Sequence, residues 1–331
     1  MQAITFPERG RVAFGPRDRR VAGDGEAVIR VMASGLCHTD FEVLKANYGT
    51  GAFPVTPGHE FAGIVTQVGP GVDGLTEGDR VVVDPNIECG RCRACRRGHA
   101  HLCETLGAYG VTRDGGFAEF CILRAGALHP IGDLPFGRAA LAEPMGCVLN
   151  ALGAVHDAKV ERALIFGAGP MGLLMALAMH MRGTADITFV DTDEARVELA
   201  RGFGFAALAA DAGELTAHRR AADLAIDATG VPAVAAGLTD YVADGGGALY
   251  FGICPVEGRI EISPFEVFRR QLTLAGTHSL NHNIPDALRA IDACGEPLDR
   301  IVSHRLPLAE MHPILSGGPP RGSLKIQAVA D

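Results

Sequence analysis

Four cysteines share one short segment, ECGRCRACRRGHAHLC: Cys89, Cys92, Cys95 and Cys103. Four thiolates within fifteen residues can complete a tetrahedral shell around zinc, and Gly90 and Gly98 permit the tight turns that such a shell needs. The residues between the cysteines are mostly Arg, Gly and His, so four unrelated core cysteines are a poor alternative. Because protein ligands would fill all four positions, this zinc has no place for a substrate and is predicted to be structural.

A second candidate metal site combines Cys37 in GLCHTD with His59 and Glu60 in PGHEFAG. Alone, a cysteine and a histidine twenty-two residues apart are explained as well by a core cysteine and a surface histidine. Both follow or precede extended segments, however, and Asp40 could accept the second N–H of a ligating histidine. Glu143 in LAEPMG is a further candidate, which could equally be an acidic residue at a helix N-terminus.

A dinucleotide-binding fingerprint lies in ALIFGAGPMG, where Gly167, Gly169 and Gly172 follow an apolar strand, with Pro170 and Met171 between the last two. Glycines at these positions let the backbone approach a pyrophosphate, which the helix N-terminus then attracts. Proline suits the first turn of that helix. A tight strand-to-helix turn without a nucleotide is the alternative.

Asp191 ends the next apolar strand, DITFVD, nineteen residues after Gly172. A carboxylate there accepts hydrogen bonds from the ribose of the adenosine, and Arg196 could cover the adenine side or that ribose. No Arg or Lys follows Asp191 directly, and its charge would repel a 2′-phosphate. The sequence therefore predicts NAD rather than NADP.

The expected secondary structure around these residues differs between two parts of the chain. Residues 26–85 consist of short extended segments separated by Gly, Pro and Asp, which is typical of β structure. From about Val148, apolar strands alternate with Ala-rich helical segments, as in a doubly wound parallel sheet. We therefore expect a first domain over 1–146, a nucleotide-binding domain over 147–281, and a return of residues 282–331 to the first.

Composition excludes several classes of protein. Hydrophobic residues make up 47% and charged residues 21%, as in a globular protein, and a net charge of −9 without a basic block disfavours nucleic acid. The N-terminus resembles no secretory signal, which predicts a cytoplasmic location. The almost uncharged stretch 163–181 is interrupted by Gly and Pro, so a buried strand, turn and helix are expected rather than a membrane span.

Together, GLCHTD, PGHEFAG, the four-cysteine segment, GDRVVVDP, Glu143 and GAGPMG resemble the medium-chain zinc-dependent alcohol dehydrogenase superfamily. The likeness runs from about Val28 to Ser279. Glu143-Pro144 and SPFEVFRRQLTLAGTHS look like the polyol and threonine dehydrogenase branch. The resemblance implies a GroES-like β-barrel catalytic domain into which a Rossmann domain is inserted.

The resemblance also implies roles for single residues. Cys37 and His59 correspond to ligands of a catalytic zinc, and either Glu60 or Glu143 completes the shell. Thr39 falls where the family has the hydroxyl that takes the substrate proton, and Asp40 where an acid orients the ligating histidine.

The resemblance also has implications for the proton relay and for the nicotinamide half of the cofactor. Relatives often have a histidine at position 42 that passes the proton to solvent, whereas this chain has Glu42, so the relay would end on a carboxylate or on water. The nicotinamide half is expected at Gly252 and Ile253 and at Thr277 to Ser279, after the last two strands of the sheet.

The expected function is the oxidation of a secondary alcohol, a sugar alcohol above all, by NAD with two zinc ions per chain. Alternatives are a threonine or phosphopolyol substrate, a zinc-free quinone reductase, and a non-catalytic NAD-binding sensor. The four-cysteine segment and the Cys37–His59 pair argue against the quinone reductase, and the intact ligand set together with Thr39 argues against the sensor. Relatives are commonly dimers or tetramers, so a homo-oligomer is expected.

Overall fold

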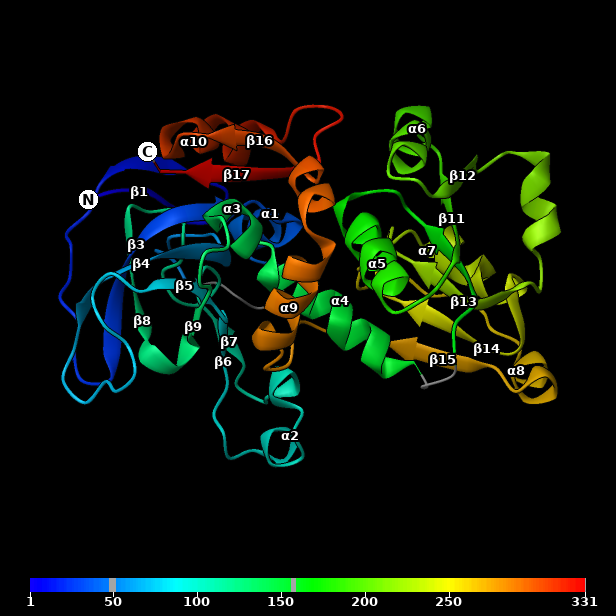
Figure 1. The fold of residues 1–331 in the computed structure, drawn as a ribbon, viewed down its shortest axis with the longest axis horizontal. Helices are drawn as coiled ribbons and strands as arrows, with labels where there is room; N and C mark the ends of the chain where they lie inside the picture. Colours follow the sequence, from blue (N-terminus) through cyan, green and yellow to red (C-terminus); the bar gives the residue numbers. More distant parts are fainter. Residues whose placement is uncertain (48–51, 156–158, 331) are drawn as a thin grey trace. The chain divides into compact units, whose positions relative to one another are not determined.

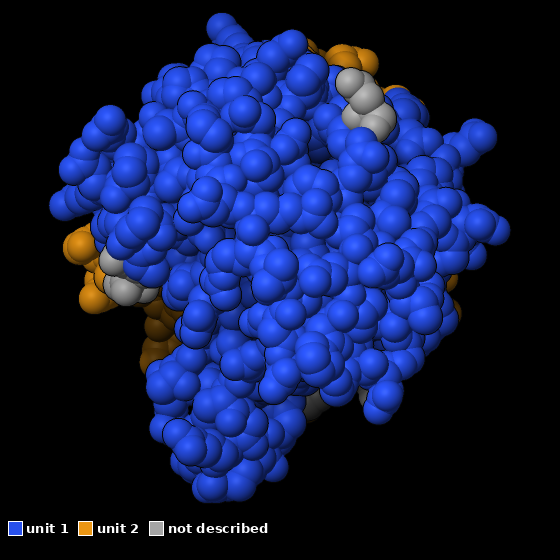
Figure 2. All heavy atoms as spheres, turned by 90° about the vertical axis from the view of Figure 1, so that its left-hand side faces the viewer, with its two compact units in different colours: residues 1–146, 280–331 blue, residues 147–279 orange. Residues whose placement is uncertain are grey.

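The computed structural model describes residues 1–47, 52–155 and 159–330, and these form two compact units. Unit 1 combines residues 1–146 with residues 280–331, and unit 2 comprises residues 147–279. Figure 2 shows the atoms of unit 1 as one continuous body, although two segments of the chain build it.

Unit 1 is built on a mainly antiparallel sheet in the order β16-β17-β3-β4-β5-β9, with β8 paired to β3. Its strands are β3 (Glu26–Gly35), β4 (Glu60–Val68), β5 (Arg80–Val83), β8 (Phe120–Arg124), β9 (Leu128–Pro130), β16 (Val302–Leu306) and β17 (Lys325–Val329). Two small sheets pair β1 (Gln2–Thr5) with β2 (Ala13–Pro16) and β6 (Asn86–Ile87) with β7 (Gly107–Ala108).

The helices of unit 1 are short and lie mostly between strands. They are α1 (His38–Leu44), α2 (Arg93–Arg96), α3 (Phe136–Ala139), α9 (Ile284–Cys294) and α10 (Leu308–Gly317), with 3₁₀ turns η2 (Ala100–Leu102), η3 (Ala125–Ala127) and η6 (Glu296–Arg300). Helix α4 (Ala142–Ala154) begins in unit 1 and ends in unit 2.

Strand β3 is the centre of unit 1 because β4, β8 and β17 all pair with it. Its residues Ala27, Ile29 and Val31 pack with Phe61 and Val65 of β4 in one buried cluster. These residues alternate along each strand, as the two-residue period of a β-strand requires when one face is buried. Strand β17, red in Figure 1, thereby joins residues near position 330 to the strand that precedes Cys37.

Unit 2 contains a six-stranded parallel sheet in the order β12-β11-β10-β13-β14-β15. Its strands are β10 (Arg162–Phe166), β11 (Asp186–Asp191), β12 (Ala206–Ala209), β13 (Ala222–Asp227), β14 (Val242–Tyr250) and β15 (Thr273–Gly276). The connections contain α5 (Pro170–Met181), α6 (Glu194–Gly202), α7 (Pro232–Gly237), α8 (Pro264–Arg270), η4 (Gly213–His218) and η5 (Leu238–Asp240).

The strand order of unit 2 reverses direction at β10, because β11 and β12 follow on one side and β13 to β15 on the other. Ligands of doubly wound sheets bind outside the carboxyl ends of the strands at such a switch point. The predicted strand, turn and helix over residues 163–181 are confirmed as β10 and α5, with residues 172–179 of the helix buried.

Candidate functional site

The first candidate metal centre lies in unit 1, where Cys37, His59 and Glu60 place their ligand atoms within 4.8 Å of one another. Cys37 caps the N-terminus of α1 just after β3 ends, and His59 and Glu60 stand at the start of β4. Because β3 and β4 pair antiparallel with Gly35 opposite Glu60, the end of one strand meets the start of the other. The pairing therefore gathers residues that are more than twenty positions apart.

Asp40 accepts hydrogen bonds from both turns that carry these candidate ligands. Its Oδ2 accepts the backbone N–H of Cys37 at 2.9 Å, and its Oδ1 accepts that of Gly58 at 3.0 Å. Oδ1 also lies 3.7 Å from Nδ1 of His59. The side chain of Asp40 is fully buried, so this carboxylate faces the imidazole from inside the protein, although no hydrogen bond joins the two in this structure.

The charges around His59 favour a cation. Burial lowers the pKa of His59, but the charge of Cys37 and the carboxylate of Asp40 outweigh burial and raise that pKa well above its usual value. Nδ1 of His59 and Oε2 of Glu60 are buried and have no hydrogen-bond partner among the described residues. A thiolate, an imidazole and a carboxylate are a donor set that suits zinc, so these residues fit that metal.

Glu60 has a partner that the sequence analysis missed. The buried Lys325 of β17 donates a hydrogen bond from Nζ to Oε1 of Glu60. Burial lowers the pKa of Lys325, but the charges of Glu60, Cys37 and Glu143 outweigh burial and hold that pKa above its usual range. No spacing in the sequence links positions 60 and 325, which meet only because β17 pairs with β3.

The two candidate carboxylates, Glu60 and Glu143, lie at different positions relative to Cys37 and His59. Glu60 belongs to the cluster with Cys37 and His59, whereas Glu143 is not in that cluster and lies in the first turn of α4. Glu143 is also buried, and its charge reaches Lys325. Both carboxylates thus contribute to the electrostatics of one region of unit 1.

Thr39 and Glu42 lie on α1, beside the candidate centre. The Sγ of Cys37 lies 3.6 Å from Oγ1 of Thr39, which places this hydroxyl next to the first candidate ligand. Glu42 accepts hydrogen bonds from Asn47 at 2.5 Å and Lys45 at 3.1 Å, and His38 Nε2 lies 3.3 Å away. The bond from Asn47 lowers the pKa of Glu42 although burial opposes it, so Glu42 is a carboxylate at neutral pH.

The four cysteines of the second candidate site also converge. The sulfurs of Cys89, Cys92, Cys95 and Cys103 lie within 4.8 Å of one another. Backbone N–H groups point at three of them, including that of Cys89, which bonds to Cys103 at 3.3 Å. Backbone hydrogen bonds lower the pKa of three thiols of the set; the largest contribution comes from Arg91 at Cys89, from Cys95 at Cys92 and from Cys89 at Cys103. Gly90 and Gly98 both adopt positive φ, as the tight turns required.

The glycine-rich turn of unit 2 connects β10 to α5. Gly167 has a φ of 103°, and a Cβ at Gly172 would collide with the carbonyl oxygen of Gly167. Gly169 caps α5, and Pro170 is its first residue, followed by Met171. These glycines keep the N-terminus of a buried helix free of side chains, as a turn that binds a pyrophosphate requires.

Asp191 stabilises the same turn. Its Oδ2 accepts the N–H of Ala168 at 2.8 Å, and its Oδ1 accepts that of Asp193 at 3.0 Å. Arg196 of α6 reaches the turn from the other side, since a Cβ at Gly169 would lie 3.2 Å from its guanidinium. Asp191 and Arg196 therefore flank the end of α5 where a nucleotide is expected.

Unpaired polar atoms gather at the carboxyl ends of β13, β14 and β15. Oδ2 of Asp227, the hydroxyl of Tyr250 and Oγ1 of Thr277 are buried and have no hydrogen-bond partner among the described residues. Gly252 lies two residues after Tyr250, and its N–H donates to the carbonyl of Asp227 at 2.7 Å. Such atoms fit a polar ligand at this edge of the sheet. The sequence analysis did not select Asp227 and Tyr250, because each ends an ordinary apolar strand.

Two more predicted cofactor positions lie in the same region of unit 2. Ile253 follows Gly252 and is 65% exposed, which is unusual for an isoleucine. Ser279, two residues after Thr277, adopts a positive φ of 54°. A non-glycine residue in that conformation is uncommon.

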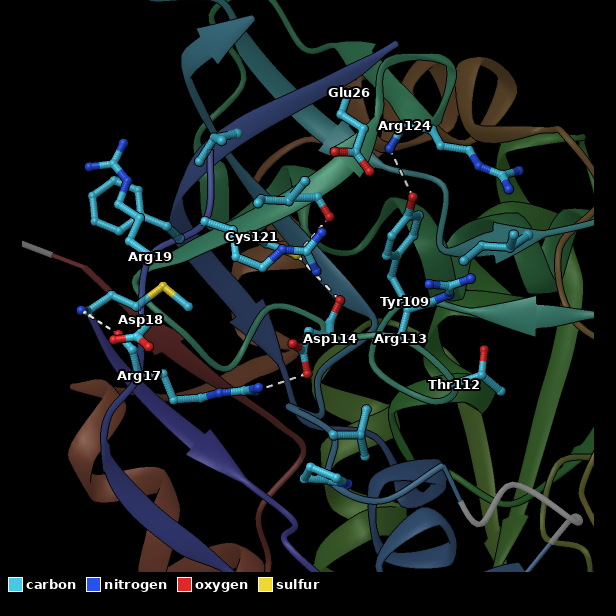
Figure 3. Close-up of a pocket in the computed structure, with 18 residues that line it drawn as sticks. Arg17, Asp18, Arg19, Glu26, Tyr109, Thr112, Arg113, Asp114, Cys121 and Arg124 are labelled. Atoms are coloured by element: carbon cyan, nitrogen blue, oxygen red, sulfur yellow. Dashed lines mark hydrogen bonds and ion pairs between the residues drawn. The ribbon is translucent and has the colours of Figure 1, made fainter. Parts of the chain in front are cut away.

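Figure 3 shows a pocket on unit 1 that none of the predicted site residues lines. Its volume is about 380 Å³, and Arg17, Asp114 and Tyr109 are among its lining residues. Arg17 donates to Asp114 at 3.0 Å within it.

Among the described residues, no helix is long and apolar enough to cross a membrane.

Two protein families match the chain. The alcohol dehydrogenase GroES-like domain matches residues 23–133, and the zinc-binding dehydrogenase domain matches residues 170–293. The chain belongs to the medium-chain zinc-dependent alcohol dehydrogenase superfamily, in the branch of the polyol dehydrogenases. Family, fold class and membership of an enzyme family that acts on CH–OH groups are thereby confirmed.

Individual relatives are similar over nearly their whole length. D-altritol 5-dehydrogenase of Agrobacterium fabrum is 48% identical over 100% of both chains. D-arabinitol dehydrogenase 1 of Uromyces fabae is 29% identical over 91% of this chain and 89% of its own. A zinc-binding dehydrogenase structure from Sinorhizobium meliloti 1021, bound to NADP, has 27% identity and a TM-score of 0.91, covering 99% of each chain.

Proposed function

We propose that this chain is a zinc-dependent polyol dehydrogenase, which transfers a hydride from a secondary alcohol of a sugar alcohol to NAD and yields the ketose. The observation that carries the proposal is the cluster of Cys37, His59 and Glu60, with two buried atoms that lack partners, in a chain of this family. Three protein ligands with a remaining open position are typical of a catalytic zinc rather than a structural one.

Cys37, His59 and Glu60 would hold this zinc, with Glu143 as the carboxylate that could replace Glu60. When bound, zinc supplies stabilisation of the negative charge that develops on the substrate oxygen. Asp40 holds the turns of Cys37 and His59 in place, so the ligand geometry does not have to form anew for each turnover.

Thr39 is the residue that accepts the proton of the substrate hydroxyl. Its own hydroxyl can pass a proton on, and it lies beside Cys37, where the substrate oxygen would be held. Glu42 is three residues further along α1 and carries a negative charge that would draw the proton towards solvent. His38, 3.3 Å from Glu42, offers a second base at the same exit.

The glycine-rich turn would bind the pyrophosphate of NAD, and Asp191 and Arg196 the adenosine. NAD supplies the hydride acceptor, and the protein positions it. Gly252, Ile253, Thr277 and Ser279 would contact the nicotinamide half. The carboxylate of Asp191 disfavours a 2′-phosphate; the relative from Sinorhizobium meliloti binds NADP, however, so both cofactors belong in the assay.

A polyol is favoured as substrate by two observations. A relative that is 48% identical over its full length is a D-altritol 5-dehydrogenase, and another relative is a D-arabinitol dehydrogenase. A carboxylate among the zinc ligands also makes the metal harder, which suits a substrate with several hydroxyl groups. Threonine is the alternative, because L-threonine 3-dehydrogenase of Pyrococcus horikoshii is 37% identical over 55% of the chain.

The four cysteines would hold a second, structural zinc.

We also propose that the enzyme is cytoplasmic and forms a homodimer or homotetramer. Exposed apolar side chains are concentrated between residues 253 and 268, where Phe265 and Phe268 are 65% and 82% exposed on α8. Strand β15, at the edge of the sheet of unit 2, follows this helix, so a second copy of the chain could cover both.

The decisive experiment is a substrate panel with zinc counted per chain. Hexitols, pentitols, phosphorylated polyols and threonine are each offered with NAD and with NADP, and absorbance at the nicotinamide band is followed. Turnover of a free polyol with NAD at two zinc ions per chain is expected. Binding of zinc and NADH without oxidation of any compound would favour a non-catalytic sensor instead.

A further inference from the structure

Lys325 occupies an unusual position for a lysine. Its side chain is only 4% exposed, and its Nζ bonds to Glu60, which is 1% exposed and 265 residues away. Removing an ammonium group from water is costly unless an anion compensates it, and one partner is rarely enough. The negative groups of the candidate metal centre therefore compensate the cost of burying the charged side chain of Lys325.

The two carboxylate oxygens of Glu60 differ in their surroundings. Oε1 accepts the hydrogen bond of Lys325, whereas Oε2 is buried and has no hydrogen-bond partner among the described residues. Glu60 offers its ligand atom in the cluster with Cys37 and His59. Oε1 of Glu60 is thus held by Lys325, whereas Oε2 is available to bind a metal ion.

The number of free oxygens matters to a catalytic metal. A carboxylate can bind zinc through one oxygen or through both, and a second bond would take the position that a substrate needs. A neighbouring ammonium that holds one oxygen prevents this second bond. It also competes with the metal for the charge of the same carboxylate, since both are cations.

We propose that Lys325 is a positioning residue of the metal centre: it holds Oε1 of Glu60, so that Glu60 offers zinc a single oxygen. The inference rests on the proposed function, because it assumes zinc on Cys37, His59 and Glu60. Lys325 thereby weakens zinc binding and keeps a coordination position open for the substrate. A purely structural ion pair would do neither.

The first test replaces Lys325 by methionine, which has a similar length and no charge. Glu60 is then free to bind with both oxygens, so release of the catalytic zinc to a chelator is expected to slow by about tenfold, opposite in sign to the loss of affinity that changes in outer-shell partners usually cause. Zinc release will have one phase for each of the two zinc ions. The phase that belongs to the catalytic zinc is the one that is missing in Cys37→Ser. Lys159→Met removes an exposed lysine, 81% accessible, and serves as the control.

A cobalt-substituted sample gives a second readout that needs no turnover. The visible absorption of cobalt weakens when a fifth ligand atom binds, and this change is expected in Lys325→Met but not in Lys159→Met. The activity of Lys325→Met should fall although its metal is held more tightly. Faster zinc release, or unchanged release and an unchanged spectrum, would overturn the inference.

Replacement of Lys325 by arginine gives the opposite expectation. The guanidinium keeps the charge and presents a fork that binds both oxygens of a carboxylate, so Glu60 would be withdrawn from zinc. Zinc release should therefore become faster than in the native protein. This variant retains the ion pair, so it tests the inference even if Lys325→Met does not fold, and unchanged release contradicts the inference.

A double-mutant cycle shows whether Lys325 acts through Glu60. In a Glu60→Gln background, Lys325→Met should no longer slow zinc release, because no carboxylate remains to be controlled. An equal effect in both backgrounds would contradict a positioning role. If native protein lacks the zinc phase that Cys37→Ser removes, the proposed function itself fails; if that phase is present but insensitive to Lys325, only this inference fails.

Discussion

Gly35 and Glu60 face each other across β3 and β4, and the carboxylate of Glu60 lies over the position where a side chain at Gly35 would begin. A Cβ at Gly35 would collide with Oε2 of Glu60 and lie 3.2 Å from its Cβ. A glycine is thus required by the close approach of a candidate ligand and not by a turn.

Substitution of Gly35 by alanine should therefore push Glu60 away from Cys37 and His59. We expect loss of the catalytic zinc together with an overpacking cost of about 1–3 kcal/mol in the free energy of unfolding. Zinc analysis and urea denaturation measure the two effects. Gly15→Ala is the control, because nothing lies within 4 Å of a Cβ there; equal zinc content in both variants would contradict the assignment of Glu60.

Zinc uptake by chelator-stripped protein should depend on pH through His59. The pKa of His59 is raised in the metal-free chain, so the imidazole is protonated below that raised value and must lose its proton before it can bind zinc. Apparent affinity should fall by about tenfold per pH unit for each proton displaced as the pH decreases. Titration with zinc at several pH values measures this.

The matched variant for this titration is His218→Asn in unit 2, which leaves the candidate centre intact and should show the same pH dependence as the native protein. An affinity that stays constant as the pH falls would mean that His59 is not a ligand.

Cofactor choice should depend on Asp191. In Asp191→Asn the charge that repels a 2′-phosphate is gone, and the bonds to Ala168 and Asp193 are weakened. We expect kcat/KM for NAD to fall by roughly tenfold, the cost of about one charge-assisted hydrogen bond, while discrimination against NADP decreases. Asp186→Asn, at the other end of β11, is the control. An unchanged ratio of the two cofactors would rule out Asp191 as the selecting residue.

The four-cysteine site should be separable from catalysis. Cys89→Ser removes one of four sulfurs, so zinc should drop from two ions per chain to one, and the thermal midpoint should fall because the segment loses its cross-link. Cys294→Ser, at the end of α9, should keep both ions. Two zinc ions retained by Cys89→Ser would show that the second ion is bound elsewhere.

Local patterns in the sequence predicted most of the fold and of the candidate site. The strand, glycine turn and helix over 163–181 could be read because each has its own spacing of apolar residues and glycines. Cys37, His59 and Asp40 could be selected because they flank segments that alternate as strands do. In each case the information lies within about thirty residues.

The remaining features depend on pairing between distant segments. Lys325 reads as an ordinary charge ahead of a short strand, and only the pairing of β17 with β3 brings it to Glu60. Asp227 and Tyr250 end apolar strands, and their unpaired oxygens are visible only once those strands lie side by side. Burial and charge compensation are properties of the assembled sheet, so no spacing in the sequence expresses them.

The bond between Glu60 and Lys325 encloses all of unit 2 within its loop of 265 residues. During synthesis Glu60 emerges from the ribosome long before Lys325 exists, and the entire Rossmann domain is made in between. A nascent chain that has the three ligand residues still lacks the cation that occupies Oε1. If Lys325 positions Glu60 as proposed, zinc captured at that stage would meet an unrestrained carboxylate, and binding through a single oxygen would follow only once β17 has been made and has paired with β3.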